Sequence, residues 1–306
     1  MITTIRFRAM GCQVEIKLET PAGGETILSQ MPARFDALED RLSRFRPHSE
    51  LMRLNARAGE WVRVSDVLFD NLRQAKHMAR LTEGLFNPLV LPALVAHGYD
   101  RSFEQMTSVA GSASQPVTDW HSIELDRDTN RVRIPAGSAI DLGGIAKGWS
   151  AQHIAHELAE EGPCLVNIGG DIAVCGAPEG LPAWEIEIAD PDGDGSLVTL
   201  WLRDSTIVTS GIDYRRWTTS DHRPRHHIIH PFSGEPAETD VRTVTIIHPH
   251  APTAEAYAKA VLLKGSEAGL QWLNTRWHAA GLVVRQDGAV LATTHLMSYF
   301  QERIPS

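Results

Sequence analysis

Four histidines lie close together in the second half of the chain: His222, His226, His227 and His230 fall within nine residues. Imidazole gains and loses its proton near neutral pH, so it can remove the proton from a hydroxyl nucleophile or ligate a metal. A zinc site usually adds Cys or carboxylate ligands at regular spacing, which this cluster lacks. The cluster therefore favours one catalytic histidine among several structural ones.

A pair of glycines precedes a predicted helix in the segment 141–147, which reads DLGGIAK. Glycine lets the backbone approach a ligand closely, and the free N–H groups in the first turn of a helix bind phosphate. The segment matches neither the P-loop nor the GxGxxG pattern. It indicates a phosphate cradle, although an ordinary turn with Asp141 as helix cap would use the same residues.

Three further patterns could carry chemistry or only structure. Residues 167–171 (NIGGD) and 209–211 (TSG) follow predicted strands. Glycines there let a ligand come close, but they also occur in plain bulges and turns. Glu255 and Lys259 are four residues apart on a predicted helix over 254–264, which is the spacing of an i,i+4 ion pair. Taken alone, such a pair is usually a solvated contact.

The elements that must position these groups do not alternate regularly between strand and helix. Apolar patterns predict strands over residues 4–8, 13–18, 123–125, 132–134, 164–168, 184–188, 197–202 and 241–247. They predict helices over 27–45 and 254–264 and a third that ends at about residue 161. Pro32 delays the start of the first helix, and Ser65 is the N-cap of a further one. A loop is expected at 111–115 and a hairpin at Asp287-Gly288.

These elements predict an α+β fold with mixed, largely antiparallel sheets and packed helices. We expect residues 1–306 to form a single compact unit, with a two-lobed split near residue 135 as the alternative.

Composition narrows the partners. The formal net charge of −9 argues against nucleic acid, because polyanion binding needs a surplus of Lys and Arg. No apolar run is long enough to insert into a membrane, and residues 1–18 alternate polar and apolar rather than form a secretory signal. We expect a cytoplasmic protein in which Cys12, Cys164 and Cys175 are free thiols.

Taken in order, these segments resemble the FAD:protein FMN transferase family. The resemblance runs through residues 10–11, 43–55, 84–88, 140–148, 167–171, 209–211, 227–231 with Gly234 and Pro236, and 254–259. No single motif is decisive, but their order and spacing together are specific and cover nearly the whole chain.

The resemblance implies that FAD is the substrate and lies in a cleft. The implied contacts are Met10, Phe45, Phe86, Asn87, Pro88, Asp141, Lys147, His226 and Ile228. It also implies that His227 is the base that removes a proton from a Thr or Ser hydroxyl of an acceptor flavoprotein. The hydroxyl then attacks the phosphorus of the FMN half, and AMP leaves.

The resemblance further implies a magnesium ion at the FAD diphosphate, beside Gly144 and two positions of a late helix that carry Asp and Thr in the family. Those positions are Glu255 and Lys259 here. Glutamate is still an oxygen ligand, but lysine has no acceptor and repels a cation. Two hypotheses remain: magnesium held by Gly144 and Glu255, or the Lys259 ammonium in its place.

Three function classes follow. The first is the transferase; the second is an FAD-binding protein without transferase activity, which Lys259 and His230 favour, since the family pattern has Asp at the position of His230. The third is an FAD pyrophosphatase that yields FMN and AMP with water as nucleophile. The sequence does not separate the first from the third, because both need the same geometry at phosphorus.

Overall fold

A computed structural model describes residues 1–21, 23–106, 115–193, 195–219 and 224–300. Within these residues the largest sheet has eight strands in the order β1-β2-β6-β7-β10-β13-β14-β15, all antiparallel to their neighbours. They are β1 (Ile2–Ala9), β2 (Cys12–Glu19), β6 (Cys164–Ile168), β7 (Asp171–Cys175), β10 (Ser205–Gly211), β13 (Val241–His248), β14 (Ala280–Arg285) and β15 (Val290–Ala292). The predicted α+β class with largely antiparallel sheets is confirmed.

Smaller sheets and helices surround this sheet. The smaller sheets are β3 (Val62–Arg63) with β5 (Arg131–Arg133) and β4 (Glu124–Asp126), β8 (Trp184–Ala189) with β9 (Ser196–Leu202), and β11 (Arg216–Thr218) with β12 (Pro224–His226). The helices are α1 (Glu25–Leu28), α2 (Met31–Leu42), α3 (Glu50–Asn55), α4 (Asp66–Leu81), α5 (Leu91–Ala96), α6 (Ala146–Leu158), α7 (Ala251–Lys264) and α8 (Ser266–Asn274). Short 3₁₀ turns are η1 (Pro88–Val90), η2 (Phe103–Gln105), η3 (Trp120–Ser122) and η4 (Thr294–Tyr299).

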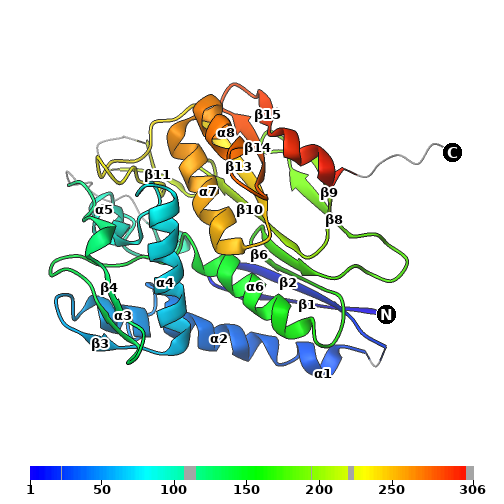
Figure 1. Cartoon of the computed structure of the whole chain (residues 1–306), viewed down its shortest axis with the longest axis horizontal. Helices are drawn as coiled ribbons and strands as arrows, with labels where there is room; N and C mark the ends of the chain where they lie inside the picture. The colour runs from blue at the N-terminus through cyan, green and yellow to red at the C-terminus, as the bar shows by residue number, and fades with distance from the viewer. Residues whose placement is uncertain (22, 107–114, 194, 220–223, 301–306) are drawn as a thin grey trace.

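The two faces of the large sheet bury different partners. On one face α2 and α6 pack against β1, β2 and β6, while α7 and α8 pack against β10, β13 and β14 (Figure 1). The other face packs against β8, β9 and η4. Side chains that alternate along a strand explain this arrangement, since Val166 faces the helices and Leu165 faces β8.

A further apolar cluster lies beside the sheet, around α3, α4 and the β3-β5-β4 sheet. It includes Val132 and Ile134 together with Ile140 and Ile145, so it joins residues from both sides of position 135. α4 also contacts α7, which brings this cluster next to the helices of the large sheet (Figure 1).

The observed helix boundaries correct the sequence analysis at the start and at the end of the helix predicted over 27–45. The helix predicted over 27–45 is two helices, and α2 begins at Met31 with Pro32 in its first turn, as a proline that lacks an N–H allows. It ends at Leu42 because Ser43 is extended, so Phe45 lies outside it. The predicted cap is confirmed, since the Ser65 hydroxyl accepts a hydrogen bond from the Leu68 N–H at 3.3 Å.

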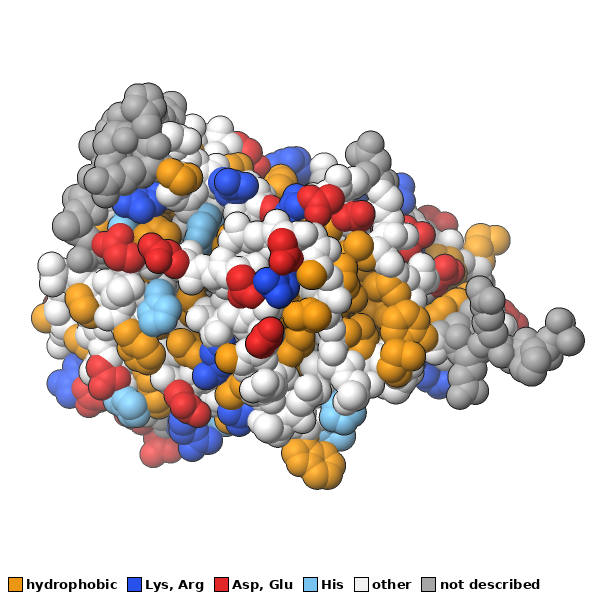
Figure 2. All heavy atoms as spheres, turned by 90° about the horizontal axis from the view of Figure 1, so that it is seen from above, with side chains coloured by type: hydrophobic (Ala, Val, Ile, Leu, Met, Phe, Trp, Pro, Cys, Tyr) orange, Lys and Arg blue, Asp and Glu red, His pale blue; other side chains and the backbone are white. Residues whose placement is uncertain are grey.

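Other expectations can be checked directly. The hairpin at Asp287-Gly288 is confirmed as the connection between β14 and β15. Of the predicted loop at 111–115, residues 111–114 lie outside the described part of the chain. No helix within the described residues combines the length and the apolar character that a membrane span requires. Acidic and basic side chains are interspersed on the face shown in Figure 2.

Asn55 ties the end of α3 to the turn that precedes α6. Its Nδ2 donates to the Ile140 carbonyl at 2.9 Å, and its Oδ1 accepts from the Ile140 N–H at 2.8 Å. Both backbone hydrogen-bonding groups of Ile140 are therefore satisfied by one side chain, which fixes the position of the Asp141 turn.

The Asn55→Ala variant should unfold with a free energy lower by about 1–3 kcal/mol, because two backbone groups lose their partner. Urea unfolding measures this loss. Arg57→Ala is the control, since Arg57 is exposed and its guanidinium pairs with nearby Glu60, and it should change stability by less than about 0.5 kcal/mol. Equal losses in the two variants would contradict the role assigned to Asn55.

Candidate active site

The largest group of predicted site residues lines one cavity of about 920 Å³. The lining includes Met10, Phe45, Phe86, Asn87, Asp141, Gly144, Lys147, His227, Ile228, Glu255 and Lys259. Two predicted contacts, Pro88 and His226, are not part of the lining. The cavity therefore brings together residues from the β1–β2 turn, the segment after α2, the start of α6, α7 and the segment after β12.

Met10 and Gly11 form a two-residue turn between β1 and β2, because Ala9 pairs with Cys12. Both have positive φ, 52° for Met10 and 71° for Gly11, as tight hairpin turns of this kind require. Glycine adopts this conformation freely, but methionine does so at a cost in free energy. The turn places Met10 at the edge of the cavity.

The Asp141 turn is held by a buried ion pair. Asp141 Oδ2 lies 2.6 Å from Arg44 Nε, Asp141 Oδ1 accepts a hydrogen bond from the Gly143 N–H, and both charged side chains are less than a tenth exposed. The Arg44 guanidinium also stacks on the rings of Phe45 and Tyr99, 4.1 and 4.4 Å from their centroids. Asp141 is not the helix cap considered from the sequence, because the N-cap of α6 is Ile145 and no side chain caps it. Asp141 instead joins the glycine turn to the aromatic wall of the cavity.

Pro88 contributes through its backbone. Its carbonyl accepts a hydrogen bond from the Asp141 N–H at 2.9 Å, so it supports the turn from behind although its side chain does not line the cavity. Phe86 and Asn87, which precede it, both reach the cavity, and Asn87 Nδ2 also donates to the Thr118 carbonyl at 3.0 Å.

Lys147, in the first turn of α6, forms an ion pair with Asp171 at the start of β7. Asp171 is almost fully buried, and this burial raises its pKa to about 6 against the attraction of the Lys147 ammonium. Burial lowers the pKa of Lys147, but Asp171 and Glu255 outweigh it and raise that pKa above its usual value. The pair thus keeps a positively charged group at the cavity beside the glycine turn.

Glu255 and Lys259 form a second buried ion pair on α7. Glu255 Oε2 lies 3.0 Å from Lys259 Nζ, and Glu255 Oε1 accepts a hydrogen bond from the Gly148 N–H at 2.7 Å. Burial acts to raise the pKa of Glu255, but the charges of Lys259 and Lys147 outweigh it and lower that pKa. The solvated pair considered from the sequence is therefore excluded, because Glu255 is almost fully buried.

Among the histidines of the cluster that the structure describes, His227 is the one that lines the cavity. Its ring lies edge-on to Tyr99 with centroids 6.5 Å apart, and within the described residues its Nδ1 has no hydrogen-bond partner. Burial, followed by the positive charges of Arg215 and Lys259, lowers the pKa of His227 well below its usual value. Its imidazole is therefore neutral at pH 7, which is the form that accepts a proton.

The other described histidines of the cluster have structural contacts. His226 Nε2 lies 3.1 Å from the Ala237 carbonyl, and His226 Nδ1 accepts from the Ile228 N–H at 3.3 Å, so His226 fixes the backbone beside His227. His230 does not line the cavity and contacts the Phe232 ring. His222 lies outside the described residues.

Sequence reasoning assigned no role to Arg44, Asp171 or Arg215. Arg215 lines the cavity, and its charge acts on both Lys147 and His227. Arg44 and Asp171 fall inside motifs of the family pattern, which single out their positions. The motifs do not indicate that Arg44 pairs with Asp141 or that Asp171 pairs with Lys147. Arg215 lies in the run Tyr214-Arg-Arg-Trp217, which carries no signal that separates it from surface arginines.

The residues at the predicted metal position do not fit magnesium. Magnesium needs about six oxygen ligands in octahedral geometry, yet each carboxylate oxygen of Glu255 already accepts a hydrogen bond. The Lys259 ammonium adds a positive charge in contact with that carboxylate. Within the described ranges, no group of three His, Cys, Asp or Glu side chains could hold a metal ion.

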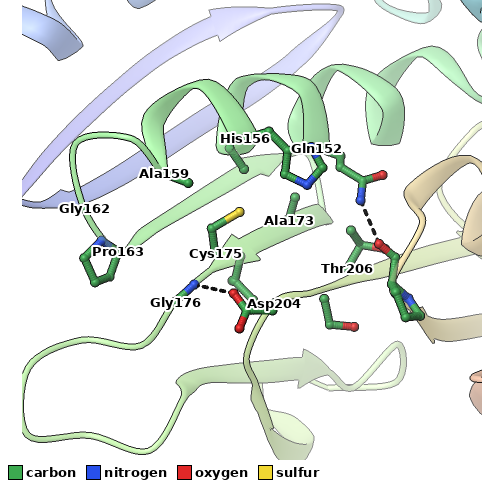
Figure 3. Close-up of a pocket in the computed structure, with 14 residues that line it drawn as sticks. Gln152, His156, Ala159, Gly162, Pro163, Ala173, Cys175, Gly176, Asp204 and Thr206 are labelled. Carbon is green, nitrogen blue, oxygen red and sulfur yellow. Dashed lines mark hydrogen bonds between the residues drawn. The ribbon is translucent and has the colours of Figure 1, made fainter.

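A second cavity of about 460 Å³ lies between α6, β7 and β10 (Figure 3). Gln152 and His156 of α6 and Cys175 of β7 line it, and the Gly176 N–H donates to Asp204 at 2.7 Å beside it. None of the predicted site residues belongs to its lining. The larger cavity is therefore the candidate active site.

All three cysteines are free, as predicted.

The Lys147→Met variant should lose about 3–5 kcal/mol of stability at pH 8, because it leaves the Asp171 carboxylate buried without its partner. The loss should be smaller at pH 5. Burial raises the pKa of Asp171 to about 6, so at pH 5 the carboxyl is mostly protonated and needs no cation. Urea unfolding at both pH values measures the difference.

Two controls accompany this variant. Lys17→Met removes a partly exposed lysine that lies 3.3 Å from Glu15, and it should cost less than about 1 kcal/mol at either pH. Adding Asp171→Asn to Lys147→Met should recover part of the loss at pH 8. A loss that is independent of pH would show that the buried carboxylate is not its cause.

The chain is similar to known proteins along most of its length. The sequence profile of the ApbE family matches residues 10–283. The chain is 32% identical to an FAD:protein FMN transferase from Treponema pallidum, over 84% of this chain and 76% of that protein. It is 29% identical to one from Vibrio cholerae, over 91% of this chain and 86% of that protein.

Solved structures show the same architecture. The ApbE protein from Thermotoga maritima superimposes with a TM-score of 0.88 at 27% identity, covering 99% of this chain and 100% of that one. The flavin transferase ApbE from Vibrio cholerae shares the fold with a TM-score of 0.81 at 24% identity, covering 98% and 99%. With a family profile that spans most of its length and relatives of this similarity, the chain belongs to the ApbE family.

Proposed function

We propose that this protein is an FAD:protein FMN transferase, which moves FMN from FAD to a Thr or Ser hydroxyl of an acceptor flavoprotein and releases AMP. The names of its relatives support this activity. One structural observation carries it: a neutral imidazole whose Nδ1 has no hydrogen-bond partner within the described residues, a glycine turn and several cationic side chains line the same cavity.

The cavity suits a large ligand with an anionic centre. Its volume of about 920 Å³ lies at the upper end of the range for small-molecule sites. Phe45, Phe86 and Ile228 supply apolar surface for a flavin ring, while Lys147 and Lys259 lie beside the glycine turn, where phosphates would bind. We assign Met10, Asn87 and Asp141 to the same binding surface, and Pro88 and His226 to its support.

In the proposed reaction, His227 takes the proton of the acceptor hydroxyl. The hydroxyl oxygen forms a bond to the phosphorus of the FMN half as the bond from that phosphorus to the bridging oxygen breaks, and this oxygen leaves with AMP. The charges of Lys147, Arg215 and Lys259 stabilise the negative charge on the phosphoryl oxygens. No step uses a metal ion.

The two competing functions differ in what they release. A pyrophosphatase would yield free FMN and AMP, and a binder would leave FAD intact. Two departures from the family pattern favour the binder, but His230 is not part of the cavity lining, so this departure does not change a residue that lines the cavity. Lys259 is the departure that changes the chemistry of the cavity, because its side chain lines it.

We also propose that residues 1–306 form one unit, supported by the apolar cluster that joins both sides of position 135. The free thiols of Cys12, Cys164 and Cys175 support a cytoplasmic location, where thiols stay reduced. The interspersed charges in Figure 2 and the net charge of −9 support a protein partner rather than nucleic acid.

The purified protein should attach FMN to threonine peptides when incubated with FAD and a library of such peptides. Mass spectrometry of the peptides and chromatography of the nucleotides should show one FMN adduct for each AMP released. AMP without an adduct would identify hydrolysis, and bound FAD that stays unchanged would identify a binder. Either outcome would contradict the proposed transfer.

His227→Ala should lower the rate of AMP release by about 100- to 10,000-fold while FAD affinity changes little, because a general base contributes about that much. In the unsubstituted protein the rate should not decline at the pH at which a free imidazole becomes protonated, and the loss attributable to His227 should come only at lower pH. The lowered pKa keeps His227 neutral there, whereas a free imidazole titrates at about 6.5. Single-turnover kinetics measure both effects.

The control for this variant is His153→Ala, because His153 is partly exposed on α6 and lies 3.4 Å from Glu157. It should keep the rate and pH profile of the unsubstituted protein. If His227→Ala were as active as His153→Ala, His227 would not be the base.

A further inference from the structure

Lys259 lies where α7 meets the glycine turn. A Cβ added to Gly144 would be 2.8 Å from Lys259 Cε and 3.4 Å from Lys259 Cδ, so the aliphatic stem of the lysine rests directly on Gly144. The Phe86 ring closes the same space at 3.2 Å. This packing limits the positions open to the lysine stem and brings its charged end to the start of α6.

The ammonium itself is held by Glu255. It lies 3.0 Å from Glu255 Oε2 and donates to the Glu255 carbonyl at 3.2 Å. Glu255 is held in turn, because its other carboxylate oxygen accepts from the Gly148 N–H in the first turn of α6. The lysine lines the cavity and is about one-sixth exposed, so a ligand can reach it.

The surrounding charges leave little room for an added cation. Lys147 and Arg215 line the same cavity, and Lys147 is already paired with Asp171. A divalent ion next to Glu255 would sit within a few ångströms of the Lys259 ammonium, and like charges at that distance repel strongly in a buried site. An anionic ligand is attracted instead, because the Lys259 ammonium and the N-terminus of α6 both carry positive charge toward it.

On the basis of the proposed function, we propose that the Lys259 ammonium is the fixed cation for the diphosphate of FAD, so that FAD binding and FMN transfer need no divalent metal. The ammonium makes a point-charge contact with the phosphate oxygens, and Glu255 keeps it in place. Lys259 is therefore both a binding residue and a determinant of metal independence.

FAD affinity measured by calorimetry provides the first test. In the unsubstituted protein the Kd should agree within about 2-fold between buffer with EDTA and buffer with magnesium chloride. A Kd at least tenfold weaker in EDTA would overturn the proposal. Because binding is measured apart from transfer, a protein that binds FAD in EDTA but attaches no FMN in either buffer would contradict the transferase activity and leave the role of Lys259 in binding intact. FMN attachment in magnesium chloride but not in EDTA would overturn the metal-independent transfer.

Substitutions provide the second test. Lys259→Met should weaken FAD about 10- to 100-fold in either buffer, which is the size expected for a lost hydrogen bond to a charged group. Lys259→Arg should recover most of the affinity. Lys264→Met is the matched control, since Lys264 lies on the same helix, faces Trp272 and is not part of the cavity lining. Lys259→Met with unchanged affinity would overturn the proposal.

Lys259→Thr restores an oxygen ligand beside Glu255. FAD should bind to this variant weakly in EDTA and at least tenfold more tightly with magnesium chloride, whereas the unsubstituted protein shows no such difference. Because Lys259→Met leaves Glu255 buried without a cation, the double variant Glu255→Gln, Lys259→Met keeps the site neutral if the single variant does not fold. Weak FAD binding by the double variant supports the proposal, and unchanged binding contradicts it.

Discussion

Buried charge at the start of α6 is the constraint on which the rest of the site depends. Two carboxylates from other elements meet there: Asp171 pairs with Lys147, and Glu255 binds the Gly148 N–H and the Lys259 ammonium. Removing a single partner would leave a charge buried in a medium that solvates it poorly. The large sheet, which supplies Asp171, and α7, which supplies Glu255, are therefore held in a definite position relative to α6.

Local pattern was enough to predict much of the scaffold. Alternation of apolar and polar residues located β8, and Ser65 identified the start of α4, because both signals lie within a few residues of the feature they specify. The helix over 27–45 was wrong because the apolar spacing continues through Ser43, while the backbone there is extended. Periodicity records which face is apolar, but it does not record where the chain turns.

The partners of charged side chains were beyond the reach of local pattern. Arg44 and Asp141 are almost a hundred residues apart in the chain and meet only because the segment after α2 runs past the glycine turn. The motifs marked both positions without joining them. The i,i+4 spacing of Glu255 and Lys259 did predict their contact, but burial, which decides whether the pair is structural or solvated, depends on how α7 packs against α6 and the sheet.

The turn between β1 and β2 limits which residues can form that edge of the cavity. Because Met10 sits at a φ of 52°, its backbone conformation excludes β-branched side chains almost completely, while asparagine and glycine would adopt it with less strain. The backbone conformation thus limits which residue types position 10 can carry, independently of any contact with a ligand. Redesign of this edge of the cavity is therefore limited to the few residue types that tolerate a positive φ in the β1–β2 turn.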